Sequence, residues 1–257
     1  MQDRYAGDIG DYGKIGLLRA LQSQGMSIAV NWYLVAPPVA EKRADGKYLI
    51  PERLKVCDEA LAEMLTGIAR GDRRSVQALE QADFVPGAVY FSESVPVDGR
   101  TEWHSKAMQA LKSADLVFVD PDNGMLAKSV GKKSVRSIKY VFYEEVRDYV
   151  GRGQSVLIYN HRSRKQEAQY FHEICSELQK ATDVLGTEIL KITFPKYSVR
   201  DYLGVSASAE HREKIEAAFI SMEQSIWGKT GMCRIPREDV RNGSDPGGPS
   251  ALCCGRL

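Results

Sequence analysis

Short apolar segments alternate along the chain with longer segments in which apolar residues recur every three or four positions. The runs Leu116–Val119 and Ser155–Tyr159 are largely apolar, which is typical of parallel strands buried on both faces. Between them, Val141–Val150 has apolar residues at roughly helical spacing and predicts a crossover helix. The same patterns predict further strands at Ser27–Val35, Ala88–Phe91 and Glu188–Phe194, and further helices at Lys14–Ser23, Val56–Arg70, Ser75–Gln81, Trp103–Ser113, Glu167–Ala181 and Ala209–Ile226.

This alternation of strands and helices predicts an α/β fold. We expect a single three-layer domain over residues 1–241, with a mainly parallel sheet and helices on both faces. The 257 residues of the chain are enough for one sizeable domain of this kind. A hydrophobic content of 43% and a charged content of 27% are ordinary for a soluble globular protein, which agrees with a packed domain.

The last segment, residues 242–257, reads NGSDPGGPSALCCGRL and has no apolar periodicity. Its Gly-Ser and Asp-Pro pairs can each be encoded across a BamHI site, and Cys-Gly-Arg can be read from a NotI site. We therefore expect a vector-derived tail, and the alternative is a natural disordered tail. In either case the segment is left out of the predicted domain.

The charge of the chain is nearly balanced. A formal net charge of +1 gives no global field that would attract nucleic acid or anionic membrane, so any polyanion site must be a local patch. No apolar run approaches the roughly 18–20 residues of a membrane helix, and the start MQDRYAGDIG lacks a signal-peptide core. The five cysteines are odd in number and lack metal-ligand spacing. We expect a cytoplasmic protein without a membrane partner.

Polar side chains follow both central strands where each apolar run ends. The turn after the first strand holds Asp120, Asp122 and Asn123, and the second strand is followed at once by Asn160 and His161. A helical crossover brings the carboxyl ends of two parallel strands to one edge of a sheet, where open α/β folds bind ligands. We therefore expect one shared cleft. The purely structural alternatives are a helix cap in the acidic turn, and a histidine that only packs in the core or faces solvent.

A glycine-rich segment, YAGDIGDYGK, precedes the first expected helix. It supplies the candidate substrate-binding residues Asp8, Asp11, Tyr12 and Lys14. Glycines before a helix let the backbone approach a phosphate or a base. The segment is neither GxGxxG after a strand nor a Walker loop, so it carries no specific motif. The structural alternative is a loop with a helix cap at Asp8 or Asp11.

Basic residues gather beside the two polar motifs, and residues 124–142 contain no acidic residue. Such a cluster suits contacts with phosphates, which supply most of the affinity for nucleic acid. The alternative is a solvated lysine-rich loop. The candidate phosphate-binding residues are Lys128, Lys132, Lys133, Arg136 and Lys139 after the first motif, and Arg162 and Arg164 after the second.

These residue types suit the cleavage of an N-glycosidic bond. The carboxylate of Asp120 would stabilise the oxocarbenium charge on the sugar or orient water, while Asn123 and His161 would act beside it on the departing base. Enzymes of this kind extrude the nucleotide into a pocket and read its edge, with Asp122 and Asn160 as candidate contacts here. No metal and no cofactor are expected for this chemistry.

The layout resembles the uracil-DNA glycosylase superfamily, in which an Asp-bearing turn follows one strand and a His-bearing loop follows a later one. The second loop departs from that pattern, since it reads NHRS in place of His-Pro-Ser, and no aromatic residue follows Asp-Pro. The segments YAGDIGDYGK, DPDNG and YNHRSR also resemble the Brig group of prokaryotic antiviral DNA glycosylases. This resemblance implies excision of glucosylated hydroxymethylcytosine from phage DNA, with Asp120, Asn123 and His161 as catalytic residues by motif position.

Three alternatives remain at this point. A strand followed by DPDNG is similar to the strand-[DN]PP[YFW] loop of adenine methyltransferases, but Asp122 replaces the second proline. The run Ala29–Val35 also leads into Pro37-Pro38, whereas a methyl-donor site needs a glycine-rich turn. A nuclease would use Asp8, Asp11, Asp120 and Asp122 to bind Mg²⁺. A non-catalytic module would read a base with the acidic turn and hold phosphate with the basic loops.

Overall fold

The computed structural model describes residues 1–36, 48–162, 165–182 and 189–236. The expected loop Glu41–Lys47, the candidate Arg164, the first residue of the expected strand at Glu188 and the tail 242–257 lie outside these residues. A six-stranded sheet in the order β2-β1-β3-β6-β8-β7 forms the centre of the described part of the chain. Its strands are β1 (Ile28–Asn31), β2 (Val89–Phe91), β3 (Leu116–Val119), β6 (Ser155–His161), β7 (Ile189–Phe194) and β8 (Arg200–Val205).

The predicted α/β fold with a mainly parallel sheet is confirmed. The strands β2, β1, β3 and β6 pair in parallel, whereas β8 pairs antiparallel with both β6 and β7. A separate pair of two-residue strands, β4 (Gly124–Met125) and β5 (Tyr140–Val141), lies in the connection from β3 to β6. The helices are α1 (Ile9–Ser23), α2 (Glu52–Lys55), α3 (Glu59–Arg70), α4 (Val76–Gln81), α5 (Arg100–Ala110), α6 (Tyr143–Gly151), α7 (Glu167–Thr182), α8 (Ala209–Gln224) and α9 (Ile226–Lys229), with 3₁₀ turns η1 (Asp3–Tyr5) and η2 (Val135–Lys139).

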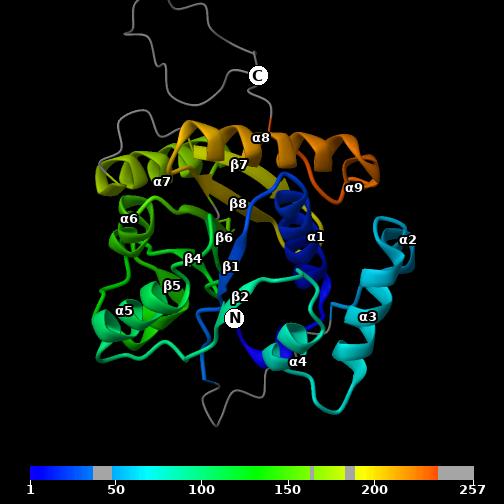
Figure 1. Ribbon diagram of the computed structural model, residues 1–257, viewed down its shortest axis with the longest axis horizontal. Coiled ribbons are helices and arrows are strands. Elements are labelled where there is room, and N and C mark those ends of the chain that lie inside the picture. The colour runs from blue at the N-terminus through cyan, green and yellow to red at the C-terminus, as the bar shows by residue number, and fades with distance from the viewer. Residues whose placement is uncertain (37–47, 163–164, 183–188, 237–257) are drawn as a thin grey trace, which may run out of the picture.

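The helices form layers on both faces of the sheet (Figure 1). The fully buried strand β3 shows why: Leu116 and Phe118 point into a core with α1, α3 and α8, while Val117 and Val119 point into a core with α5, α6 and α7. Successive side chains of a strand point to opposite faces, so a strand covered on both sides must be apolar throughout. This burial on both faces explains why the sequence of β3 is continuously apolar.

The sequence patterns misplace several boundaries and miss β8 of the central sheet as well as the short strands β4 and β5. The helix expected from Lys14 begins at Ile9, because Asp8 caps it by accepting hydrogen bonds from the amides of Gly10 and Asp11. From Ile9 onward, the glycine-rich segment therefore forms the first turns of α1 and not a loop. The strand β8 was not expected, although it lies between β6 and β7.

The order of the strands creates a topological switch point. The chain passes from β1 to β2 on one side, and then to β3 on the other side of β1. The carboxyl ends of β1 and β3 border the place where the strand order reverses, which is where open α/β sheets bind ligands. Asp120 follows β3 directly at this place.

Candidate functional site

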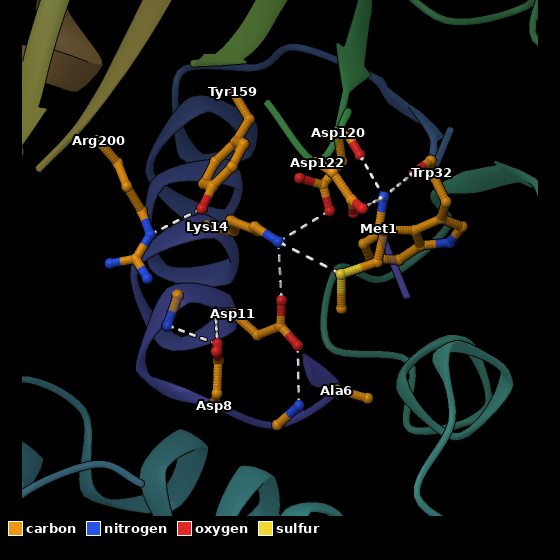
Figure 2. A network of polar contacts seen from close by, with 12 residues as sticks. Met1, Ala6, Asp8, Asp11, Lys14, Trp32, Asp120, Asp122, Tyr159 and Arg200 are labelled. Carbon is orange, nitrogen blue, oxygen red and sulfur yellow. Dashed lines mark hydrogen bonds and ion pairs between the residues drawn. The ribbon is translucent and has the colours of Figure 1, made fainter. Parts of the chain in front are cut away.

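The two polar motifs lie at the same edge of the sheet, as the sequence predicts. The strands β3 and β6 are adjacent and parallel, with Val119 opposite Ile158. The turn that begins at Asp120 therefore emerges beside the end of β6, which carries Asn160 and His161. The N-terminal part of α1 lies against this edge, and Figure 2 shows Asp8, Asp11 and Lys14 approaching it from the helix.

A buried lysine joins the N-terminal cluster to the first motif. The Nζ atom of Lys14 lies 3.0 Å from Oδ1 of Asp11 and 2.8 Å from Oδ2 of Asp120. All three side chains are buried, and Lys14 also lies over the ring of Tyr159, 4.7 Å from its centroid. One ammonium thus contacts two carboxylates and one aromatic face (Figure 2).

The charges in this group depend on one another. Burial raises the pKa of the Asp120 and Asp11 carboxyls, and Lys14 opposes that rise. Burial alone would favour the neutral amine of Lys14, but the two carboxylates raise its pKa well above the ordinary value. Lys14 is therefore an ammonium at neutral pH, and its charge opposes the protonation that burial favours at Asp120.

The second motif is connected to this group through a tyrosine. The Tyr159 hydroxyl lies 3.1 Å from Nε2 of His161 and accepts a hydrogen bond of 2.7 Å from Nε of Arg200. Burial lowers the pKa of His161 to about 4, and the nearby cations Arg200 and Lys14 act in the same direction. The imidazole is consequently neutral at physiological pH, which lets it donate or accept a hydrogen bond.

The first residues of the chain fill the switch point. The Met1 ammonium donates to the carbonyls of Trp32, Tyr33 and Asp120 at 2.9–3.1 Å, and lies 3.1 Å from Oδ1 of Asp122. Gln2 donates a further hydrogen bond to Asp122. Burial would raise the pKa of Asp122, but the Met1 ammonium, the hydrogen bond from Gln2 and the charge of Lys139 together outweigh burial, and the pKa is lowered. Asp122 is thus an anion held by the N-terminal residues.

The side chain of Asn160 stabilises the DPDNG turn. Its Oδ1 accepts a hydrogen bond of 3.1 Å from the amide of Met125, and its Nδ2 donates to the Tyr170 hydroxyl at 2.9 Å. Gly124 has φ of +102°, and a Cβ atom there would lie 2.1 Å from Oδ1 of Asn160. The turn therefore requires glycine at position 124. Asn123 is partly exposed in the same turn, and its backbone amide donates to the carbonyl of Lys139 at 2.9 Å.

Two residues of the N-terminal cluster are not brought into this group. Asp8 caps α1, which is the structural alternative read from the sequence. Tyr12 is fully buried, and its hydroxyl accepts from the amide of Asp58 and donates to carbonyls near the ends of α2 and α3. Both side chains have structural roles in α1. Of the four candidates in the N-terminal cluster, Asp11 and Lys14 belong to the group around Asp120.

The basic candidates divide into paired and unpaired side chains. Lys132 lies 2.6 Å from Glu144, and Arg162 forms ion pairs with Glu167 and Asp201. Lys128 is mostly exposed and lies 3.7 Å from Glu177. Lys133 and Arg136 are exposed around η2, and Lys139 lowers the pKa of Asp122 from a half-buried position.

The sequence interpretation missed Tyr159 and Arg200 as members of the site. Tyr159 was read only as the last residue of an apolar strand, and Arg200 belongs to the unexpected strand β8. In the pairing of β6 with β8, Arg200 lies opposite His161 and Tyr202 lies opposite Tyr159. The buried Tyr202 hydroxyl has no hydrogen-bond partner among the described residues.

Comparisons with protein-family models, with curated proteins and with solved structures gave no match to this chain. Within the described ranges, no three His, Cys, Asp or Glu side chains form a group that could hold a metal ion. No helix in that part of the chain is long and apolar enough to cross a membrane.

Proposed function

We propose that this protein is a DNA glycosylase that hydrolyses the N-glycosidic bond of a modified base. The observation that carries the proposal is the buried Asp120 carboxyl group at the switch point, which is paired with Lys14 and connected through Lys14 and Tyr159 to a neutral His161. The substrate class follows from the family resemblance of the sequence, and is glucosylated hydroxymethylcytosine in phage DNA. Its removal leaves abasic sites, which would serve as antiviral defence.

The proposed chemistry assigns a different role to each member of the group. As the glycosidic bond breaks, the sugar gains positive charge and the base gains negative charge. Asp120 stabilises the sugar cation electrostatically or orients the attacking water. His161 donates a hydrogen bond to the departing base, for which a neutral imidazole is sufficient. Asn123, which is partly exposed in the same turn, is proposed to contact the base edge.

Lys14 favours water, rather than an amine, as the nucleophile. An amine must be neutral to attack the sugar, and the two carboxylates at 2.8 and 3.0 Å hold Lys14 as an ammonium. The proposed product is therefore a free base and an intact abasic site.

Substrate entry requires part of this group to move. Asp120 is 1% exposed, and the Met1 ammonium contacts both its carbonyl and the side chain of Asp122. A shallow depression of about 480 Å³ between α3 and α4 lies away from these residues. The proposal therefore includes displacement of Met1 and Gln2 when an extruded nucleotide enters the switch point.

A non-catalytic nucleic-acid-binding module is the second candidate function. The observation that favours it is that the acidic side chains of the site already have partners within the protein. Asp11 and Asp120 both contact Lys14, and Asp122 contacts Met1 and Gln2. In that case the charged group would stabilise the fold, while the exposed residues around η2 would contact phosphate.

A base-release assay separates these candidates. The protein is incubated in EDTA with three duplexes that carry glucosylated hydroxymethylcytosine, hydroxymethylcytosine or cytosine. Released base is measured by mass spectrometry and abasic sites by alkaline cleavage. We expect release from the glucosylated duplex only. Binding to all three duplexes without release from any of them would contradict the proposal and favour the binding module.

A further inference from the structure

Two exposed tyrosines form an aromatic surface at the same edge of the sheet. Tyr48 is 54% exposed and Tyr197 is 50% exposed, yet their ring centroids lie only 5.8 Å apart with an interplanar angle of 41°. They come from distant parts of the sequence. Large aromatic side chains are usually buried, so two of them in contact on the surface indicate a ligand.

The backbone holds Tyr197 in a strained conformation. Its φ is +65°, in the left-handed region that a bulky residue rarely adopts. A hydrogen bond of 2.9 Å from the amide of Ser198 to the carbonyl of Lys196 closes a three-residue turn around it. Glycine would fit this turn without strain, so the presence of tyrosine calls for another explanation than folding.

The turn is tied to the group around Asp120. The buried Arg200 donates to the carbonyls of Lys196 and Ser198 at 3.4 and 3.1 Å, and its Nε donates to the Tyr159 hydroxyl. Tyr159 in turn contacts His161 and Lys14. One guanidinium thus links the strained turn to the residues proposed to act on the substrate, as Figure 2 shows for Arg200, Tyr159 and Lys14.

The backbone of Tyr48 is hydrogen-bonded to the start of α1. Its carbonyl accepts a hydrogen bond of 2.9 Å from the amide of Ile9, the first residue of that helix. Lys196, next to Tyr197, makes no ion pair with any described residue. The buried Ser198 hydroxyl also has no partner in the described part of the chain. The surface therefore offers two rings and, among the described residues, one cation without an ion pair.

We propose that Tyr48 and Tyr197 bind an unpaired base of the DNA strand, next to the nucleotide that enters the switch point. This inference rests on the proposed function for the choice of DNA as ligand. The rings are tilted and in contact, so a base stacks on their outer face and does not insert between them. Stacking on an aromatic ring tolerates any base, while Lys196 contacts the neighbouring phosphate. The surface holds the strand and takes no part in bond cleavage.

The test uses an unmodified single-stranded oligonucleotide with one 2-aminopurine, whose fluorescence falls when it stacks. Wild-type protein should bind and quench it. Tyr197→Gly should lose about 5- to 100-fold in affinity, the range for one lost base stack, while its melting temperature is unchanged or higher because the strain is relieved. Tyr197→Phe should bind like wild type. Met64→Ala, an exposed apolar change on α3, is the control and should bind normally.

Unchanged affinity and quenching in Tyr197→Gly would overturn the stacking proposal, as would an absence of binding by wild-type protein. A Tyr197→Gly variant that binds normally but sediments differently from wild type would show a contact between protein chains instead. The glycosylase proposal stands apart from this result, because the oligonucleotide carries no modified base. Stacking without base release would contradict the glycosylase alone.

Discussion

At the scale of single residues, the electrostatics of the site depend on Lys14. A carboxylate as buried as Asp120 would ordinarily take up a proton, and a lysine as buried would ordinarily lose one. Here Lys14 lies 2.8 Å from Asp120 and 3.0 Å from Asp11, so each charge opposes the effect of burial on its partner. Removing Lys14 would leave two buried carboxyl groups without their cation, which is far more costly than losing a surface ion pair.

Gly124 gives a prediction about the backbone of the DPDNG turn. Gly124→Ala should destabilise the protein by about 1–3 kcal/mol from the left-handed backbone alone, with an added cost from the clash with Asn160. Chemical denaturation measures this loss. Gly131→Ala is the matched control, because Gly131 has open space around the position of a Cβ atom. Equal stability of the two variants would show that the turn differs from the one described.

His161 gives a prediction about pH. An unfolded histidine titrates near pH 6.5, roughly its unperturbed value, whereas the pKa of His161 in the folded protein is about 4. Between these values the unfolded chain binds more protons than the folded protein. The free energy of unfolding should therefore fall as the pH decreases through this window.

The measurement compares wild type with His161→Gln by chemical denaturation at several pH values. The variant should lose less stability than wild type between pH 6.5 and 4, because it lacks the titrating imidazole. His172→Gln, a change at an exposed position on α7, should follow the wild-type curve. Parallel curves for wild type and His161→Gln would contradict a neutral, buried His161.

At the same scale, the sequence predicts some members of the site and not others. Asp120 and His161 are foreseeable because each comes soon after a short apolar run in the sequence. Arg200 is not, because its contact with Tyr159 requires the pairing of β6 with β8, which no local pattern encodes. The role of Asn160 is also not foreseeable, since its two hydrogen bonds hold a turn and another helix in place.

At the scale of elements, β8 shows where hydrophobic patterning fails. Its sequence RDYLGV begins with two charged residues and contains a glycine, so it lacks the continuous apolar run of β3. In the structure, Asp201 pairs with Arg162 and Gly204 allows Ile215 of α8 to approach the strand. Those partners come from the residue after β6 and from α8, so only the tertiary structure makes RDYLGV a buried strand.

The segment around η2 carries the prediction about DNA binding. Lys133 and Arg136 are exposed there, whereas Lys132 is already paired with Glu144. Lys133→Ala with Arg136→Ala should weaken DNA binding and reduce the slope of log affinity against log salt by roughly 0.7–0.9 for each lost phosphate contact. Lys112→Ala, exposed near the start of β3 at the opposite edge, should leave the slope unchanged. A double variant with the wild-type slope would show that this segment only faces solvent.

At the scale of the whole molecule, the strand order explains why distant segments meet. The reversal between β1 and β3 opens a place at one edge of the sheet, and α1 brings Asp11 and Lys14 to it from the start of the chain. The sequence predicts that the two motif loops share this edge, because one crossover helix separates their strands. It does not predict that Met1 and Gln2 fill the switch point, since nothing in their local sequence marks these contacts.

The central claim is that the Asp120 carboxylate acts in base release, and its most direct test is Asp120→Asn in the EDTA assay with the glucosylated duplex. We expect base release to fall by about 10²–10⁴-fold, the range for a positioned acid–base or electrostatic group, with DNA affinity retained. Asp98→Asn makes the same charge change at an exposed position and should release base normally. Circular dichroism checks that the Asp120→Asn variant is folded. A folded Asp120→Asn protein that releases the base at the wild-type rate would contradict the claim.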